Sequence, residues 1–201
     1  METEPMLKVY LAGPEVFLPG GRELIDRKRE ALAEFGFAPT RRHADFMERD
    51  EKDPRAFGEE ISRLNEELMD DADLCIANLT PFRGISADVG TVFELGYMIA
   101  QGKPAYGFTN DPRDYSVRAT DYFGSATIES GRLVSPDGEM IEQHGMADNL
   151  MIDGGISHRG WSLQRAQTTP ETMWTDLSAF RRVLTIARDQ LHNREHHDDA
   201  Q

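Results

Sequence analysis

Residues 74–103 restrict the possible fold of this chain more than any other stretch. They begin with the short apolar run Leu-Cys-Ile-Ala-Asn-Leu, whose length and flanking turn residues predict a strand covered on both faces. A loop with proline, glycine and serine follows, and then an apolar segment that predicts a helix. Asp88 stands where the N-cap of that helix belongs, and Gly102 stands just past its end. A strand, a loop and a helix in this order are half of a βαβ unit, so we expect an α/β fold.

The rest of the chain continues this alternation. Further strands are expected at residues 7–12, 37–40 and 103–108, and helices at 22–35 and 57–68. Another helix is expected to start within residues 146–152, and a C-terminal helix at about 170–191 is expected to begin at Pro170. Residues 113–147 are the least regular part, and we expect an insertion with a small hairpin there. Residues 193–201 are expected to be a polar tail. No linker or internal repeat divides the chain, so we predict a single domain over residues 1–201.

The composition limits the possible partners. The chain has 201 residues, of which 39% are hydrophobic, and a formal net charge of −14. This charge argues against a nucleic-acid polymer as partner, because phosphate contacts require basic residues. We expect no signal peptide and no membrane span, because no long apolar run occurs. The single cysteine, Cys75, lies in the predicted buried strand and is expected to be inert, and these features together point to the cytoplasm.

Glu94 fits its surroundings least well. It lies in a helix whose other positions are largely apolar, and a buried carboxylate costs several kcal/mol unless it is paired or protonated. Gly90 and Thr91, one turn earlier on the same face, are small and leave a hollow with Asp88 at its mouth. One interpretation is that Glu94 pairs with an arginine or lysine from elsewhere. The other is a concave site with two carboxylates and room for a sugar-sized group.

Four segments, in order along the chain, resemble the nucleoside 2-deoxyribosyltransferase family. They read Val-Tyr-Leu-Ala-Gly-Pro from residue 9, Ala-Asp-Leu-Cys-Ile-Ala-Asn-Leu from residue 72, Asp-Val-Gly-Thr-Val-Phe-Glu-Leu-Gly-Tyr from residue 88, and Asp-Asn-Leu-Met from residue 148. The resemblance implies a flavodoxin-like three-layer α/β fold with a mostly parallel five-stranded sheet, plus the hairpin insertion and the C-terminal helix. It also implies an enzyme that exchanges the base of a 2′-deoxynucleoside for a free nucleobase by double displacement, with no cofactor and no metal.

The resemblance assigns roles to residues near Glu94. Glu94 would be the nucleophile that attacks C1′ of the sugar, and the Tyr10 hydroxyl would hydrogen-bond its carboxylate. Asp88 would grip the sugar hydroxyls. Gly13, in the loop after Tyr10, and Gly90 would belong to the substrate-binding surface.

Asp148 and Asn149 have two possible roles. The resemblance implies that they reach into the site of a neighbouring subunit and help to hold the 5′-hydroxyl of the sugar. A homo-oligomer with a shared active site is then expected. The alternative is that they are only caps of the helix that begins there.

Asn65 departs from the family pattern. The family often carries an aspartate eight residues before the position that matches Asp73, where it is thought to handle the proton of the leaving base. Here that residue is Asn65, whose amide can orient a base but cannot exchange a proton as an acid. We expect Asn65 either to contact the base or to be a polar residue of the helix surface.

Other functions are compatible with the same features. A nucleoside or nucleotide N-glycosidase would use the same site with water as the acceptor. Glu15, after the first strand, would repel a phosphate and therefore favours nucleosides over nucleotides. A non-catalytic nucleotide-binding module needs no buried carboxylate, and a Toll/interleukin-receptor-like domain fits the spacing from Asp88 to Glu94 less well.

Two polar segments offer weaker candidates. The charged loop at residues 41–55 contains His43, Asp45 and Phe46, which could contact a base by hydrogen bonds and stacking. His192 and His196 have a spacing that can bind a metal on one helix face. Without a nearby third ligand, we expect no metal site there.

Overall fold

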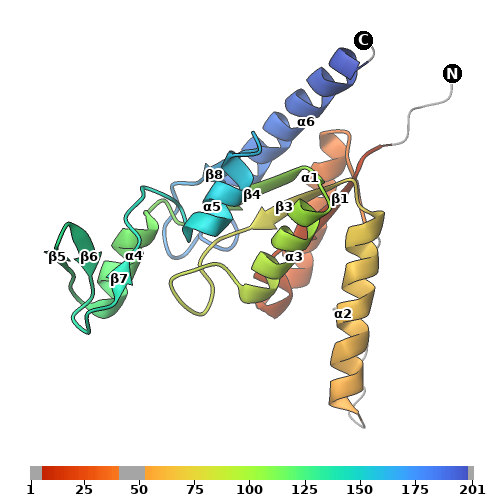
Figure 1. The fold of residues 1–201 in the computed structure, drawn as a ribbon. Helices are drawn as coiled ribbons and strands as arrows, with labels where there is room; N and C mark the ends of the chain where they lie inside the picture. Colours follow the sequence, from red (N-terminus) through yellow and green to blue (C-terminus); the bar gives the residue numbers. More distant parts are fainter. Residues whose placement is uncertain (1–5, 41–52, 199–201) are drawn as a thin grey trace, which may run out of the picture.

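The computed structural model describes residues 6–40 and 53–198 (Figure 1). Its centre is a five-stranded sheet in the order β2-β1-β3-β4-β8, in which every neighbouring pair is parallel. The strands are β1 (Lys8–Ala12), β2 (Ala38–Pro39), β3 (Leu74–Asn78), β4 (Ala105–Thr109) and β8 (Leu163–Arg165). This is the flavodoxin-like strand order, so the expected fold class is confirmed. The order reverses between β1 and β3, and ligands of such sheets bind at the carboxyl ends of the strands near this point.

Helices cover both faces of the sheet. One face carries α1 (Gly21–Glu34) and α6 (Ser178–Asp198), and the other carries α2 (Pro54–Asp71), α3 (Val89–Ala100) and α5 (Leu150–Ser157) (Figure 1). Because both faces are covered, β3 and β4 are buried along their whole length, as the apolar sequence of β3 predicts.

The insertion contains more regular structure than its sequence suggests. The expected hairpin is present as β5 (Thr127–Glu129) and β6 (Arg132–Val134), and β7 (Met140–Ile141) adds a third antiparallel strand. A helix, α4 (Tyr115–Phe123), precedes this small sheet, and the four elements stand beside the main sheet (Figure 1). No amphipathic pattern marks α4 in the sequence, because Arg118 is one of the few buried residues of this helix and interrupts the apolar period.

The C-terminal helix differs from its prediction at both ends. α6 begins at Ser178 rather than at Pro170, because residues 170–175 form turns. The side chain of Asp176 accepts a 2.8 Å hydrogen bond from the backbone N–H of Ser178 and so satisfies one donor at the start of the helix. The helix continues to Asp198, so the segment predicted to be a polar tail is helical up to that residue.

β8 was not located in the sequence because Leu-Gln-Arg carries no strand pattern, and only its pairing with β4 defines it. His43, Asp45 and Phe46 lie outside the described residues. Within the two ranges that the structure describes, no helix has the length and apolar character needed to cross a bilayer.

Candidate active site

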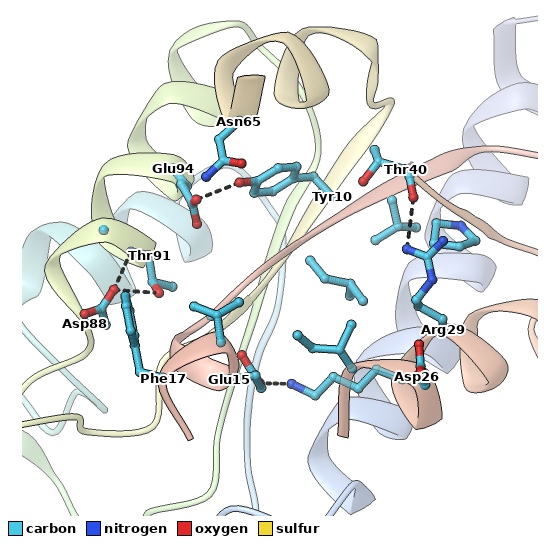
Figure 2. A pocket seen from close by; sticks show the side chains of 18 of the residues that line it. Tyr10, Glu15, Phe17, Asp26, Arg29, Thr40, Asn65, Asp88, Thr91 and Glu94 are labelled. Carbon is cyan, nitrogen blue, oxygen red and sulfur yellow. Dashed lines mark hydrogen bonds and ion pairs between the residues drawn. The ribbon is translucent and has the colours of Figure 1, made fainter. Parts of the chain in front are cut away.

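A cavity of about 370 Å³ lies at the carboxyl end of β1 (Figure 2). Its walls come from β1, from the 3-10 turn η1 (Pro14–Phe17) and from α1, α2 and α3. Among the described residues, β2 pairs with Lys8 and Val9 of β1, and the next two residues of β1, Tyr10 and Leu11, line the cavity. The volume falls within the range of roughly 300–1,000 Å³ that is typical of small-molecule sites. The cavity therefore lies where the strand order predicts a ligand site.

Most of the predicted site residues meet in this cavity. Those that line it are Tyr10, Gly13, Asn65, Asp88, Gly90 and Glu94. They come from β1, the turn after it, α2 and α3, so the fold brings together segments that are distant in the sequence.

Glu94 and Tyr10 form the central contact. The Tyr10 hydroxyl donates a 2.6 Å hydrogen bond to Oε1 of Glu94. Tyr10 is on β1 and is 1% exposed, whereas Glu94 is half-buried in the middle of α3. Such a charge-assisted bond to a partly buried carboxylate is short and strong, and it fixes the carboxylate in one rotamer. The cavity can therefore present an oriented carboxylate oxygen to a ligand.

Asp88 holds the start of the same helix. Its carboxylate Oδ2 accepts hydrogen bonds from the backbone N–H of Thr91 at 3.1 Å and from the Thr91 hydroxyl at 3.3 Å. A Cβ at Gly90 would lie 3.1 Å from that same oxygen, which is a tight contact. The predicted N-cap is thus confirmed, and the glycine leaves the carboxylate room at the mouth of the cavity.

Asn65 reaches the cavity from α2. Figure 2 shows its amide next to Glu94 and the Tyr10 hydroxyl. A side-chain amide offers both a donor and an acceptor. Asn65 can therefore orient a polar ligand beside the carboxylate.

Glu15 is a charged residue of the cavity wall whose surroundings the sequence analysis misjudged. It is 4% exposed, it forms an ion pair with the ammonium group of Lys28, and it accepts a 2.6 Å hydrogen bond from Nδ2 of Asn78. A Cβ at Gly13 would lie 2.0 Å from Glu15 Oε2, so a glycine at position 13 is required to leave room for this carboxylate. Lys28 lies in the apolar stripe of α1, and that position was the available signal of a buried partner.

The ion pair with Lys28 alters the charge that Glu15 presents to a ligand. Because Lys28 neutralises it, Glu15 does not present an uncompensated negative charge to a phosphate. The preference for nucleosides over nucleotides that the sequence suggested therefore loses this support.

Phe17 is a further residue of the cavity that the sequence analysis did not identify. It is 55% exposed, and Figure 2 shows it beside Asp88. Its ring stacks on Phe82 with centroids 5.8 Å apart, and the Arg83 guanidinium lies 4.9 Å from the Phe17 centroid. An exposed ring at the mouth of a cavity can pack against a flat ligand group.

Cys75 lies behind the central contact and opposite Tyr10 in the β1–β3 register. Burial, and to a lesser extent the charge of Glu94, raise the pKa of its thiol well above the ordinary range. The reactive thiolate form is therefore disfavoured, in line with the expectation that Cys75 is inert.

Asp148 and Asn149 are not among the residues that line this cavity. Asp148 is 1% exposed, and its carboxylate is engaged by groups of its own chain. Asn149 caps α5 by accepting a 3.0 Å hydrogen bond from the backbone N–H of Met151. The capping role is thus observed for Asn149 in its own chain.

The residues 6–40 and 53–198 contain no group of three or more histidine, cysteine, aspartate or glutamate residues arranged to hold a metal ion. The cavity is lined by carboxylates, a phenol hydroxyl, an amide, an aromatic ring and the basic side chains of Lys28 and Arg29.

Comparison with known proteins identifies the class of this α/β protein. The profile of the family described as nucleoside 2-deoxyribosyltransferase matches residues 9–151. An uncharacterized protein of Schizosaccharomyces pombe is 36% identical over 167 residues, which are 76% of this chain and 78% of that protein.

The chain was also compared with solved structures. A 2-deoxyribosyltransferase from Leishmania mexicana has a TM-score of 0.57 and 27% identity, over 85% of this chain and 96% of that chain. A 2-deoxyribosyltransferase from Bacillus psychrosaccharolyticus has a TM-score of 0.45 and 21% identity, over 57% of this chain and 80% of that chain. The chain belongs to the nucleoside 2-deoxyribosyltransferase family.

Proposed function

We propose that this protein transfers the deoxyribosyl group of a 2′-deoxynucleoside to a free nucleobase, with Glu94 as the nucleophile. The observation that supports this proposal is the carboxylate of Glu94, held by the Tyr10 hydroxyl at 2.6 Å inside a cavity of suitable size. The family to which the chain belongs carries the same activity in its name.

The proposed reaction has two steps. A Glu94 carboxylate oxygen attacks C1′, the bond from C1′ to the base nitrogen breaks, and the electron pair leaves with the base. The result is a deoxyribosyl ester of Glu94. A nitrogen of the second base then attacks C1′ from the face that the first base left, the ester bond breaks to release the Glu94 carboxylate, and the incoming nitrogen loses its proton to solvent. Two inversions give retention at C1′.

The other residues of the cavity have supporting roles in this proposal. Asp88 binds the sugar hydroxyls. Gly90 leaves space for the substrate, and Gly13 leaves space for the Glu15 carboxylate. Asn65 orients the base through its amide. The leaving base takes its proton from solvent, because a side-chain amide such as that of Asn65 cannot act as the acid.

Association between chains is part of the same proposal. Large apolar side chains are exposed on α3 and α5, close in sequence to Asp88 and Asn149: Val89 is 84% exposed, Phe93 59% and Met151 73%. Exposed apolar residues that gather on neighbouring helices are typical of protein–protein contacts. We propose a homo-oligomer in which the half-buried Asn149 completes the sugar site of a neighbouring chain.

Hydrolysis is the second candidate. Water would replace the second base in the final step, and the pairing of Glu15 with Lys28 removes the argument against a nucleotide substrate.

The experiment that distinguishes these functions is incubation with deoxyinosine and adenine, followed by chromatography. Formation of deoxyadenosine supports transfer, whereas release of free deoxyribose supports hydrolysis. If neither product forms with deoxyinosine or with other 2′-deoxynucleosides, the proposed function is wrong.

A further inference from the structure

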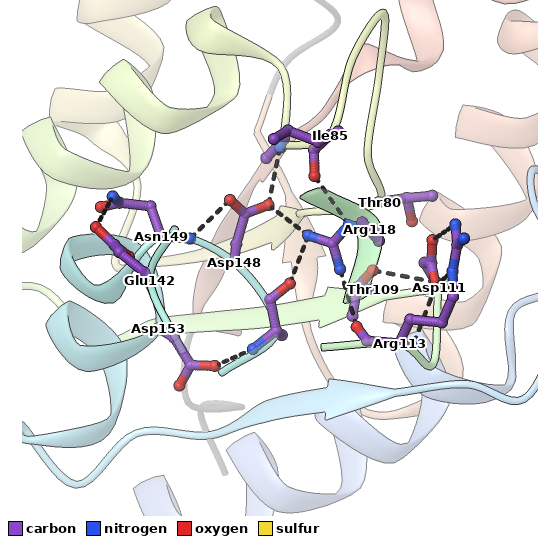
Figure 3. Close-up of polar contacts among 12 residues, drawn as sticks. Thr80, Ile85, Thr109, Asp111, Arg113, Arg118, Glu142, Asp148, Asn149 and Asp153 are labelled. Carbon is purple, nitrogen blue, oxygen red and sulfur yellow. Dashed lines mark hydrogen bonds and ion pairs between the residues drawn. The ribbon is translucent and has the colours of Figure 1, made fainter. Parts of the chain in front are cut away.

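Arg118 connects the insertion to the loop before α3. It lies on α4 and is 3% exposed. Its Nε donates to the carbonyl oxygen of Ile85 at 2.8 Å, and Nη1 and Nη2 donate to the carbonyls of Arg113 and Ala147 at 2.9 and 2.7 Å (Figure 3). A guanidinium that donates to three carbonyls from three segments holds those segments at fixed separations.

Asp148 completes this contact from the other side. Its Oδ2 accepts a 2.9 Å hydrogen bond from the backbone N–H of Ala87 and lies 3.4 Å from Nη2 of Arg118 (Figure 3). Its Oδ1 accepts from the backbone N–H of Asn149 at 2.8 Å. Both members of the pair are buried, and a buried pair of this kind is stable only while its hydrogen bonds are made.

The contacted loop leads directly into the site. Residues 85–88, which we call the α3 entry loop, end at Asp88, the N-cap of α3. Arg118 holds the carbonyl of Ile85, and Asp148 holds the amide of Ala87, so two of the four residues of the loop are fixed by this pair. Glu94 lies less than two turns into the same helix.

A second carboxylate of the insertion supports the same region. Glu142, which follows β7, accepts a hydrogen bond from Nδ2 of Asn149 at 2.7 Å (Figure 3). It also accepts one from the backbone N–H of Leu150 at 2.8 Å. It thereby holds the start of α5 next to Asp148.

We propose that the insertion at residues 113–147 is a positioning element of the active site, which acts through the Arg118–Asp148 pair on the α3 entry loop. The pair fixes the start of α3 and with it the carboxylates of Asp88 and Glu94; this catalytic consequence depends on the function proposed above. In this proposal Arg118 and Asp148 act through the α3 entry loop and are positioning residues. Displacement of a reacting group by about 1 Å can lower a rate by about a hundredfold, so a loop held at Ile85 and Ala87 matters for catalysis.

The test compares Asp148→Asn with Asp114→Asn. Both variants remove one negative charge near α4, but Asp114 pairs with Arg165 and has no hydrogen bond to the α3 entry loop. We expect Asp148→Asn to speed amide hydrogen exchange in residues 85–91 and to lower kcat for base exchange about tenfold to a hundredfold. The assay temperature is one at which circular dichroism shows the variant to be folded. Asp114→Asn should change neither quantity.

Arg118→Lys provides a second variant, for use if Asp148→Asn does not fold. Lysine keeps the charge but cannot donate to three carbonyls in fork geometry, so we expect faster exchange in the same residues and a smaller fall in kcat. The proposal is wrong if the folded variants exchange and turn over like the wild type, or if Asp114→Asn has the same effects. If the wild type shows no transfer or hydrolysis, the proposed function fails, while amide exchange still decides whether the pair holds the loop.

Discussion

The Tyr10 hydroxyl donates a 2.6 Å hydrogen bond to the Glu94 carboxylate across 84 positions of the sequence. The two residues meet because β1 lies beside β3 at the centre of the sheet and α3 packs across both strands. This hydrogen bond joins β1 to α3, the helix capped by Asp88. Both bonded residues line the cavity (Figure 2).

Removal of this hydrogen bond should impair catalysis more than folding. We expect Tyr10→Phe to lower kcat about tenfold to a hundredfold, because a hydrogen bond to a charged group contributes about 1.5–3 kcal/mol. The ring stays buried, so the free energy of unfolding should fall by only about 1 kcal/mol. Steady-state kinetics and urea unfolding measure the two effects.

Tyr97→Phe is the matched control for that variant. Tyr97 is also on α3, but its hydroxyl donates to Asp70 on α2, and Tyr97 does not line the cavity. A similar loss of kcat in both variants would mean that the Tyr10 hydroxyl has no particular role in catalysis.

Loss of the Glu94 carboxylate should abolish base exchange. Glu94 is half-buried and its backbone is helical, so Glu94→Ala should remain folded and lose little stability. Intact-protein mass spectrometry of the wild type with a deoxynucleoside donor alone should reveal a deoxyribosyl adduct, and the variant should show none. A variant with wild-type turnover would exclude Glu94 as the nucleophile.

A shared site predicts rescue between inactive chains. We expect Glu94→Ala and Asn149→Ala to be inactive separately and to regain part of the activity when mixed under conditions of subunit exchange, because a mixed oligomer contains a complete site. Activity assays after mixing, with light scattering to measure the oligomer, test this. An active monomer, or no rescue after demonstrated exchange, would contradict the shared site.

Asn149→Ser controls for the cap of α5. Serine keeps a capping oxygen for the backbone N–H of Met151 but lacks the amide N–H groups. Both Asn149 variants also lose the hydrogen bond to Glu142 in their own chain. Inactivity alone therefore does not decide the role of the amide, but Asn149→Ser should complement Glu94→Ala as well as Asn149→Ala does if the amide contacts the sugar of the neighbouring site.

Asp111 should make stability depend on acid pH. Burial raises the pKa of its carboxyl, but hydrogen bonds from Arg113 and the charge of that residue outweigh burial, so the pKa lies below its ordinary value. A lowered pKa in the folded state means that Asp111 stabilises the protein above the ordinary carboxyl pKa of about 4, and that this contribution is lost as the pH falls below it.

The variant Asp111→Asn measures that contribution. Its free energy of unfolding should be about 1–2 kcal/mol below that of the wild type at pH 7, and the difference should shrink toward pH 3. Asp121→Asn removes the exposed partner of the same arginine and should cost at most about 0.5 kcal/mol at pH 7. A difference that is independent of pH would show that the Asp111 charge does not stabilise the fold. Urea unfolding at several pH values provides the measurement.

The sequence by itself determined the elements whose signal is local. The apolar run of β3, the Asp88 cap of α3 and the hairpin of the insertion each depend on residues within a few positions of one another, and all three are present. The ordered motifs likewise indicated the flavodoxin-like fold and six of the residues that line the cavity.

Only the tertiary structure decided the contacts between distant positions. β8 exists because β4 pairs with it, and the buried charge of Lys28 acquires its meaning from Glu15 on another element. Local sequence predicted a cap or a substrate ligand at Asp148, but its contacts with Arg118 and with the amide of Ala87 come from the fold. Periodicity and capping are properties of neighbouring residues, but the partner of a buried charge is set by which elements pack together, and no local pattern encodes that choice.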